Sequence, residues 1–338
     1  MNGATRIQRR RLLLGGCAAA TATAAATLGA PLHAFAQPAP WPIKPIRLIV
    51  SFSTGSGNDT IARELAIAMT QSLGQSVVVE NRGGGGGVIG TEAVAKAAPD
   101  GYTIGLGTSS QLVMNVGLYR SLPFDVEKDL HAIGLVSRTP LVLVASADMP
   151  GTLKELIALA KARPGQVSYG SGGPGSISHI VGEAFAKAAG VQLLHVPYKG
   201  NGAALIDLSG GHVKLLFDGL ISTAPLAKQG KLKMLAISGD KRSPMAPTLP
   251  TFAEQGLRDY EAYTWNDLMA PAGTPPEVLA KLNTALNQAL ALPAVQTRLA
   301  QGASDPLGPT TPAQAEAYGR AERARWVPFI RSLRIDNP

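Results

Sequence analysis

Residues 46–63, IRLIVSFSTGSGNDTIAR, decide the fold that the sequence predicts. The opening run Ile46–Val50 is rich in β-branched residues and typical of a buried strand. Asn58 or Asp59 can then cap a helix whose apolar residues recur at helical spacing. These apolar residues are Ile61, Leu65, Ala68 and Met69.

The loop between this strand and helix, residues 51–57, consists of small residues apart from Phe52. The first N–H groups of a helix lack intrahelical partners, and the macrodipole adds roughly half a positive charge there. The pattern therefore predicts an anion site that suits a carboxylate or a phosphate. The alternative is an ordinary βα turn that is rich in Gly, Ser and Asn. The predicted ligand-binding residues are Phe52, Ser53, Thr54, Gly55, Ser56, Asn58 and Asp59.

Length and composition are compatible with two globular domains. The chain has 338 residues, of which 45% are apolar and 16% charged, enough for two cores. Aromatic residues make up only 5%, which argues against a surface that stacks on nucleic-acid bases. If the four arginines near the N-terminus are left out, the chain has 27 Lys+Arg and 23 Asp+Glu, which gives a net charge of +4. These charges are dispersed, so neither nucleic acid nor a membrane surface is an expected partner.

Residues 1–36 have the pattern of a cleaved export signal. A basic start precedes an Ala/Thr-rich stretch, and residues 34–36 form a small-x-small cleavage site. Residues 9–13 resemble a twin-arginine signal, while general secretion stays open because Gln8 stands where that signal usually has serine. We therefore expect a periplasmic protein.

The same segment contains the single cysteine, Cys17. Residues 14–17 resemble a lipoprotein cleavage box, but too few apolar residues separate them from the arginines. Loss of Cys17 with the signal would leave neither disulfide nor thiol chemistry nor a Cys-based metal site. No later apolar run approaches the ~18 residues that a membrane span needs.

Strands and helices alternate after the opening segment, which is typical of a parallel sheet covered by helices. The glycine run at 83–87 forms a G-x-G-x-x-G with Gly90. A dinucleotide fold would need an acidic residue about twenty positions on, where residues 105–107 offer none, so no cofactor is predicted. Thr108 and Ser109 can add hydroxyls to the pocket or simply cap a helix. The expected elements here are strands at 46–51, 76–80 and 102–106, and helices at 59–72 and 91–97.

A second domain is predicted to begin at residues 138–140, which separate two apolar strands. Beyond residues 242–250, which are loop-like, the chain is expected to return to the first domain. The remaining expected elements are strands at 130–136, 141–145, 167–170, 192–196, 212–217 and 232–237, and helices that begin near 153, 177, 276 and 312.

The second domain repeats the design of the opening segment. A strand at 167–170 is followed by the small-residue loop 171–176 and by a helix. Two anion-ready loops in two domains predict a ligand held between them. His179, in the first turn, can donate to a carboxylate or make a structural hydrogen bond. The predicted ligand-binding residues here are Ser171, Gly172, Gly173, Gly175, Ser176, His179 and Asp218.

Catalytic motifs are not evident. A serine nucleophile would need the glycines of G-x-S-x-G, and the loop serines lack them. Asp59, Asp218 and His179 form an acid–base set only if the fold brings them together. The histidines show no metal-ligand spacing, so no metal site is expected. The pattern favours a binding protein over an enzyme. The serines considered are Ser109, Ser171 and Ser176.

Several ordered segments match one family pattern at matching spacing. They are residues 41–47, 78–82 with 89–90, 99–103, 122–125, 195–200 and 270–275. Through them, essentially the whole mature chain resembles the Bug family of periplasmic solute-binding proteins, the receptors of tripartite tricarboxylate transporters.

The resemblance implies an α/β fold of two hinged lobes, the type II or Venus-flytrap periplasmic-binding-protein fold, with a ligand cleft between them. It also implies a small organic carboxylate as ligand and membrane permease subunits as partners. The family's first loop usually has the pattern P-F-x-P-G-G-x-x-D-x-x-A-R. Here Ser51, Thr54 and Ser56 replace two prolines and a glycine, which adds three hydroxyls. The second loop follows the family's S-x-G-x-G-S-x-x-H, apart from its own variant at 172–174.

We therefore expect lobe 1 at about 40–140 and 250–338 and lobe 2 at about 141–249, after the signal at 1–36. The expected protein is a monomeric periplasmic receptor without catalytic activity, cofactor or metal. The alternative is a ligand sensor that signals to a histidine kinase. Citrate-like, dicarboxylic, amino-acid and aromatic acids all stay open as ligands.

Overall fold

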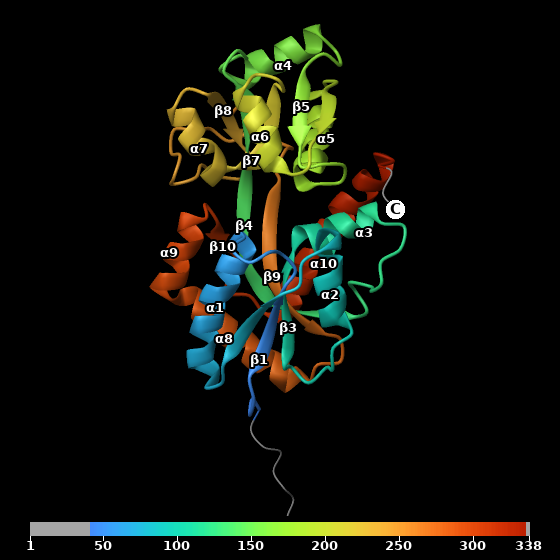
Figure 1. Ribbon diagram of the computed structural model, residues 1–338, viewed down its shortest axis with the longest axis vertical. Helices are drawn as coiled ribbons and strands as arrows, with labels where there is room; N and C mark the ends of the chain where they lie inside the picture. The colour runs from blue at the N-terminus through green and yellow to red at the C-terminus, as the bar shows by residue number, and fades with distance from the viewer. Residues whose placement is uncertain (1–40, 336–338) are drawn as a thin grey trace, which may run out of the picture. The chain divides into compact units, whose positions relative to one another are not determined.

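The chain forms two α/β lobes joined by long strands (Figure 1). The computed structural model describes residues 41–335, so the predicted export signal and Cys17 lie outside the described residues. The lower lobe in Figure 1 contains the early and late parts of the described chain, and the upper lobe contains the middle part. These are called lobe 1 and lobe 2 below.

Lobe 1 is built on a mixed sheet. The opening strand β1 (Ile46–Val50) pairs in parallel with β2 (Val77–Asn81) and β3 (Thr103–Thr108). β9 (Tyr263–Pro271) pairs antiparallel with β3 and with β4 (Leu130–Ser146). The predicted parallel arrangement therefore holds for β1–β3 and is wrong for β4 and β9. The remaining strand, β10 (Asp305–Pro306), pairs with β4.

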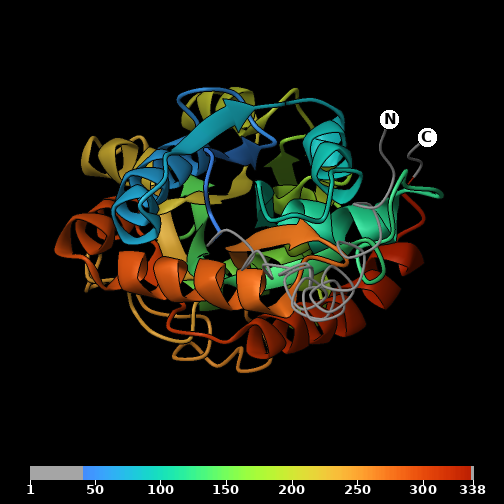
Figure 2. The same ribbon diagram turned by 90° about the horizontal axis from the view of Figure 1, so that it is seen from below.

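Helices cover both faces of this sheet. α1 (Gly57–Leu73) and α8 (Pro276–Ala291) lie side by side on one face, where they bury Ile46 and Leu48 (Figure 2). Ile49 packs in a separate cluster with residues of other helices. Because both faces of β1 are buried, it needs the nearly continuous apolar run that the sequence has. The other helices are α2 (Val88–Ala95), α3 (Asn115–Leu118), α9 (Pro293–Gln301) and α10 (Pro312–Ser332), with the short η1 (Gly85–Gly87) and η2 (Ser110–Met114).

Lobe 2 contains the second group of strands. β5 (Ser168–Ser171) lies between β6 (Leu194–Pro197) and β7 (Leu215–Gly219), and it runs parallel to both. The later part of β4 pairs antiparallel with β7 and with β8 (Leu232–Ile237). None of the helices within residues 41–335 has the length and hydropathy of a membrane span. The helices of lobe 2 are α4 (Leu153–Ala162), α5 (Ile177–Ala189), α6 (Asn201–Ser209) and α7 (Leu220–Lys228).

A single strand, β4, runs through both lobes (Figure 1). It pairs with β9 up to Pro140 and with β7 from Leu141 onward. The sequence predicts two strands separated by residues 138–140, and that prediction is wrong. Pro140 is tolerated because it pairs with Tyr263, the first residue of β9, where that ladder ends.

Several other elements differ from expectation. The expected helices include none between the strands at 192–196 and 212–217, but α6 begins there after Gly200, which offers no side-chain cap. α7 contains Pro225 in its interior, although proline usually ends or kinks a helix. β9 includes the polar pair at 266–267, which interrupts its apolar pattern. Tertiary packing overrides the local signal in each case.

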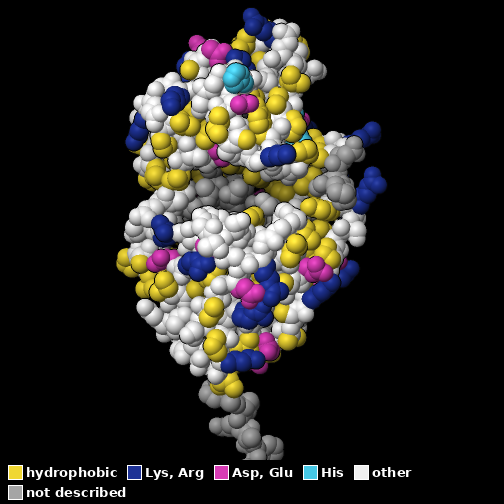
Figure 3. Space-filling model, in the orientation of Figure 1, with side chains coloured by type: hydrophobic (Ala, Val, Ile, Leu, Met, Phe, Trp, Pro, Cys, Tyr) yellow, Lys and Arg dark blue, Asp and Glu magenta, His cyan; other side chains and the backbone are white. Residues whose placement is uncertain are grey.

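The register of the strands brings the loop ends of both lobes together. Thr108 at the end of β3 pairs with Asn266, near the start of β9. Gly219 at the end of β7 pairs with Leu141, where β4 enters lobe 2. Since β1 is parallel to β3 and β5 to β7, the carboxyl ends of all four strands point toward this crossover. Such ends are where open α/β sheets bind ligands, and Figure 3 shows the surface hollowed between the lobes.

Candidate functional site

The first loop of the candidate site, residues 51–56, leads from β1 into α1. Gly55 has a positive φ of 81°, and its N–H donates to Oδ2 of Asp59 at 2.8 Å. Ser56 caps α1, because its hydroxyl accepts from the N–H of Asp59 at 3.2 Å. The predicted cap at Asn58 or Asp59 is therefore wrong, since the helix begins at Gly57. The tip of the loop, residues 53–55, is exposed. The remaining N–H groups of the first turn of α1 have no intrahelical acceptor and face the crossover side of the lobe.

Asp59 is the structural centre of this loop. Its buried carboxylate accepts from Nδ2 of Asn81 at 2.9 Å and from Nε of Arg63 at 3.0 Å. The hydrogen bond from Arg63 is the main cause that lowers the pKa of Asp59 to about 2, although burial opposes it. Asn81 extends the network, because it also donates to the carbonyl of Phe52 and accepts from the hydroxyl of Thr54. Both oxygens of Asp59 are therefore engaged in holding the loop.

Asn58 connects the first loop to β9. Its Oδ1 accepts from Nδ2 of Asn266 at 2.9 Å. Asn266 is buried, and its own Oδ1 accepts from the hydroxyl of Ser137 on β4 at 3.4 Å. The start of α1 is thus tied to the two strands that join the lobes.

Thr108 and Ser109 lie at the end of β3, close to Asn266 in the sheet, but both are buried. The hydroxyl of Thr108 donates to Oε1 of Gln111 at 2.8 Å. The hydroxyl of Ser109 accepts from the N–H of Trp265 at 3.4 Å. Thr108 also accepts from the N–H of Gln111 at 3.4 Å, a contact of the capping kind, whereas Ser109 makes no cap hydrogen bond to the following helix.

The glycine run lies beside the first loop at the carboxyl end of β2. All residues at 84–87 have positive φ, a conformation that glycine adopts readily. The carbonyl of Gly86 accepts from Asn115 at 3.1 Å, and that of Gly85 accepts from Tyr119 at 3.4 Å. The run is therefore a tight connection fastened to the region of α3.

The second loop, residues 172–176, is bonded mostly to the two elements that flank it, β5 and α5. Three of its glycine N–H groups donate to side chains of these elements, so they are not free to bind a ligand. These bonds join Gly172 to Ser178 Oγ at 3.0 Å, Gly173 to Ser171 Oγ at 3.1 Å and Gly175 to His179 Nδ1 at 3.0 Å.

Ser176 caps α5 as Ser56 caps α1. Its hydroxyl accepts from the N–H of His179 at 3.3 Å and lies 3.1 Å from the hydroxyl of Ser178. The N–H groups at the start of α5 have no intrahelical acceptor. Together with the half-buried hydroxyl of Ser176, they are the donors that this loop offers to the crossover side.

Asn201 links the second loop to the end of β7. Its Oδ1 accepts from the hydroxyl of Ser178 at 2.7 Å, and its Nδ2 donates to Oδ1 of Asp218 at 2.9 Å. The other carboxylate oxygen of Asp218 accepts from Ser222 at 2.8 Å. Asp218, like Asp59, is thus occupied by neighbouring residues.

Two imidazole rings stack behind the second loop. The ring centroids of His179 and His195 lie 3.9 Å apart with an interplanar angle of 8°. Nε2 of His195 lies 2.6 Å from the hydroxyl of Ser171. Burial lowers the pKa of His179 to about 4, with a smaller contribution from His195, and burial also lowers the pKa of His195. Both rings are neutral at pH 7, so Nδ1 of His179 can accept from Gly175.

The site as a whole offers uncharged donors. The predicted site residues include no lysine or arginine, and their two carboxylates are already bonded. First-turn N–H groups and hydroxyls can hold a carboxylate through hydrogen bonds and the partial positive charge of helix ends. Within residues 41–335, no cluster of three or more His, Cys, Asp or Glu could hold a metal ion.

Comparison with known proteins places this geometry in a family. The sequence model described as "Tripartite tricarboxylate transporter family receptor" matches residues 61–335. The chain belongs to this receptor family. BugT of Bordetella pertussis is 40% identical over 311 residues, which cover 91% of this chain and 94% of BugT. The resemblance to Bug proteins is thereby confirmed.

Solved structures of tripartite tricarboxylate transporter receptors and similar proteins share the fold. A Rhodopseudomonas palustris protein solved with adipate is 34% identical, with a TM-score of 0.75, over 87% of this chain and 99% of that one. MatC from the same organism, solved with bound malate, is 30% identical, with a TM-score of 0.72, over 86% and 99%. The predicted two-lobed α/β fold is confirmed.

Sequence reasoning missed three asparagines of the receptor site: Asn81, Asn201 and Asn266. Each side chain is hydrogen-bonded to residues that are distant in the sequence. Asn266 and Asn58, for example, are 208 positions apart. Asn81 lies within the family-like segment at 78–82, and Asn201 directly follows the segment at 195–200. Those segments are the signal that could have pointed to them.

Proposed function

We propose that this receptor binds a small organic carboxylate between its lobes and delivers it to the permease subunits of a tripartite tricarboxylate-type transporter. Similar receptors support the ligand class, because two of them were solved with adipate and malate, which are dicarboxylates. Membership of the transporter receptor family supports the partner.

The observation that carries the proposal is the pairing of two serine-capped helix N-termini across the crossover. Ser56 opens α1 in lobe 1, and Ser176 opens α5 in lobe 2. Each follows a strand whose carboxyl end points toward the other lobe. Two such ends suit two carboxylate groups of one ligand, because each end binds an anion without a buried cation.

The proposed roles of the site residues fall into two groups. The residues proposed to contact the ligand directly are Phe52, Ser53, Thr54, Gly55, Ser56 and Asn58 in lobe 1, and Ser176 with the start of α5 in lobe 2. The residues proposed to position these loops have their polar atoms engaged within the protein. They are Asp59, Thr108, Ser109, Ser171, Gly172, Gly173, Gly175, His179 and Asp218.

The proposal also covers where the receptor acts, where its lobes divide and its oligomeric state. We propose that residues 1–36 direct export to the periplasm and are removed. We further propose that the lobes divide at about residues 140 and 250, as the sequence predicts, and that the receptor acts as a monomer. Its binding role involves no catalytic step.

A thermal-shift screen of carboxylates, beginning with adipate and malate, tests the proposal. A true ligand at 100 times its dissociation constant should stabilise the protein by ~2.7 kcal/mol. Calorimetry should then give one binding site, and X-ray scattering should give a smaller radius of gyration with ligand than without it. Long incubation should return the acid unchanged. Failure of every carboxylate to stabilise the protein, or conversion of the bound acid, would overturn the receptor proposal.

A further inference from the structure

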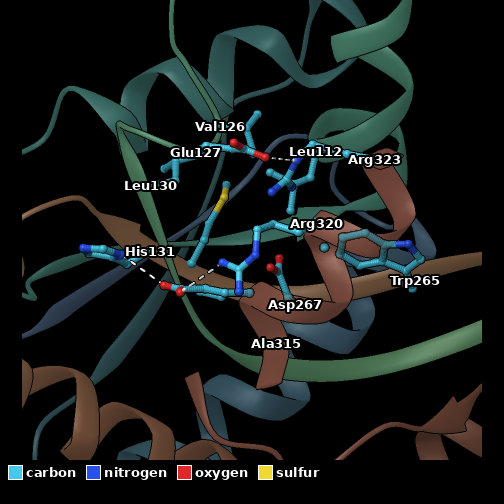
Figure 4. A pocket seen from close by; sticks show the side chains of 14 residues that line it. Leu112, Val126, Glu127, Leu130, His131, Trp265, Asp267, Ala315, Arg320 and Arg323 are labelled. Atoms are coloured by element: carbon cyan, nitrogen blue, oxygen red, sulfur yellow. Dashed lines mark hydrogen bonds and ion pairs between the residues drawn. The ribbon is translucent and has the colours of Figure 1, made fainter. Parts of the chain in front are cut away.

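A second cavity lies in lobe 1, on the α10 side of the sheet (Figure 4). Its volume is about 210 Å³, much more than one water molecule requires. β9 separates it from the first loop of the receptor site. Asn266 points toward that loop and bonds Asn58, whereas the next residue, Asp267, points to the opposite face and lines the cavity.

Asp267 is a buried carboxylate with one oxygen that has no hydrogen-bond partner within the described residues. Its side chain is 4% exposed, and Oδ1 has no hydrogen-bond partner among residues 41–335. Figure 4 shows the carboxylate pointing into the cavity. Gly107 of β3 pairs with Asp267, and only glycine leaves room for the carboxylate there, because a Cβ on Gly107 would lie 2.2 Å from Oδ1. The sheet thus makes room for this carboxylate, while no group within residues 41–335 donates to its Oδ1.

The other charged side chains around the cavity are paired with one another. The pairs are Arg323 Nε with Glu127 Oε1 at 3.1 Å, His131 Nδ1 with Glu316 Oε1 at 3.1 Å, and Arg320 Nη1 with Glu316 Oε2 at 3.7 Å. Burial raises the pKa of Asp267 to about 7, while the charge of Arg323 opposes the shift. The carboxylate of Asp267 is therefore the group among the described residues of this cavity that lacks an opposite charge, so the cavity suits a cation and not an anion.

We propose that this cavity binds a small primary alkylammonium ion. The ammonium group has three N–H donors, which match the carboxylate of Asp267 and remove the cost of leaving it unpaired. The apolar side chains of Leu112, Leu130 and Met269 line the same cavity and suit a short alkyl chain. A carboxylate ligand is disfavoured, because it would face Asp267. A metal ion would lack ligands, since no cluster of three His, Cys, Asp or Glu side chains forms within the described residues.

The test uses n-butylammonium as probe and n-butanol as its neutral counterpart. Trp265 lines the cavity, so its indole N–H signal in NMR spectra reports occupancy. We expect a saturable shift with n-butylammonium and none with n-butanol. Asp267→Asn should weaken binding at least tenfold, because it removes a charge-assisted hydrogen bond. Asp259→Asn, at an exposed carboxylate outside this cavity, should bind as the parent does.

Two further measurements keep the proposal testable if Asp267→Asn fails to fold. Ala315→Leu fills part of the cavity and should also weaken binding of n-butylammonium. In the parent protein, binding should tighten as pH rises through 7, because the ionised carboxylate is the binding form. The other groups that face Asp267 and titrate or carry charge are Glu127, His131, Glu316, Arg320 and Arg323. Equal shifts with n-butanol, or parental affinity in both Asp267→Asn and Ala315→Leu, would overturn the proposal.

Discussion

Gly175 in lobe 2 lies so close to Leu118 in lobe 1 that a Cβ on Gly175 would stand 2.8 Å from Leu118 Cδ1. Gly175 belongs to the second loop of the receptor site, and Leu118 ends α3. Gly175 also has a positive φ of 76°, which glycine adopts at little cost. Glycine is therefore needed at position 175 for two reasons: a larger residue would collide with Leu118 of the other lobe, and the positive φ disfavours other residues.

Gly175→Val should weaken carboxylate binding by at least tenfold, because the valine side chain would hold the second loop away from α3. Calorimetry with the acid that the screen identifies measures this loss. Gly211→Val is the matched control, since Gly211 has a φ of 73° but no atom within 4 Å of the added Cβ. Both variants should lose stability, roughly 1–2 kcal/mol from the backbone conformation. Equal affinity losses in the two variants would show that the contact with Leu118 is irrelevant.

Ser176→Ala should reduce both stability and affinity. The helix cap contributes about 1 kcal/mol to stability, and a lost hydrogen bond to a carboxylate should weaken binding about tenfold to a hundredfold. Thr152→Ala removes an equivalent cap from α4 and should cost similar stability at unchanged affinity. Lys231→Ala, at an exposed residue, should change neither. Urea unfolding and calorimetry separate the two effects, and a Ser176→Ala variant that binds like the parent would contradict the assigned contact.

Asp59→Asn should loosen the first loop. The carboxylate contributes stability above the unfolded pKa of 3.8, and this contribution is lost as pH falls toward the folded pKa of about 2. At pH 7 the variant should therefore lose roughly 1.5–3 kcal/mol, with no further pH dependence between pH 5 and 8. Asp259→Asn serves as the exposed control in urea unfolding. A variant as stable as the parent would mean that the network around Asn81 and Arg63 does not depend on the charge.

The stacked histidines should make stability depend on pH. The pKa of His179 is lowered from 6.5 to about 4 in the folded protein, so the unfolded chain takes up its proton first. Stability should consequently fall as pH decreases from 6.5 to 4, while the protonated ring also loses its acceptor for Gly175. His179→Gln should flatten this dependence in thermal melts, and His212→Gln, at an exposed histidine, should keep it. Parallel curves for parent and His179→Gln would refute the assignment.

Asp267→Asn should have the opposite pH signature. The pKa of Asp267 is raised from 3.8 to about 7, so between pH 4 and 7 the unfolded chain loses this proton while the folded protein keeps it, and stability falls as pH increases. The variant should gain stability relative to the parent over that range, by roughly 1–3 kcal/mol at pH 8. Differential melts at pH 5 and pH 8 measure the effect. A stability difference that is constant with pH would show that the pKa of Asp267 is not raised in the folded protein.

The sequence by itself determined the class of fold and the places of the two loops. The run Ile46–Val50 and the small residues after it are neighbours in the chain, so local propensity suffices to predict a strand, a loop and a helix. The same holds for the strand, loop and helix around Ser176. This repeated design predicted a second domain, and the family-like segments implied two hinged lobes. Local propensity did not fix the cap of the first helix, because it favours Asn58 or Asp59, whereas Ser56 caps the helix.

Only the tertiary structure decided how those loops are held and what surrounds them. β4 is one strand because β9 and β7 pair with its two parts, although the local pattern around Pro140 favours a break. Asn58 meets Asn266 across 208 residues. Oδ1 of Asp267 has no hydrogen-bond partner within residues 41–335, because the residues of β3, β9 and α10 that surround it offer none. Contacts of this kind depend on chain segments brought together by packing, and local periodicity carries no information about which distant side chains will meet.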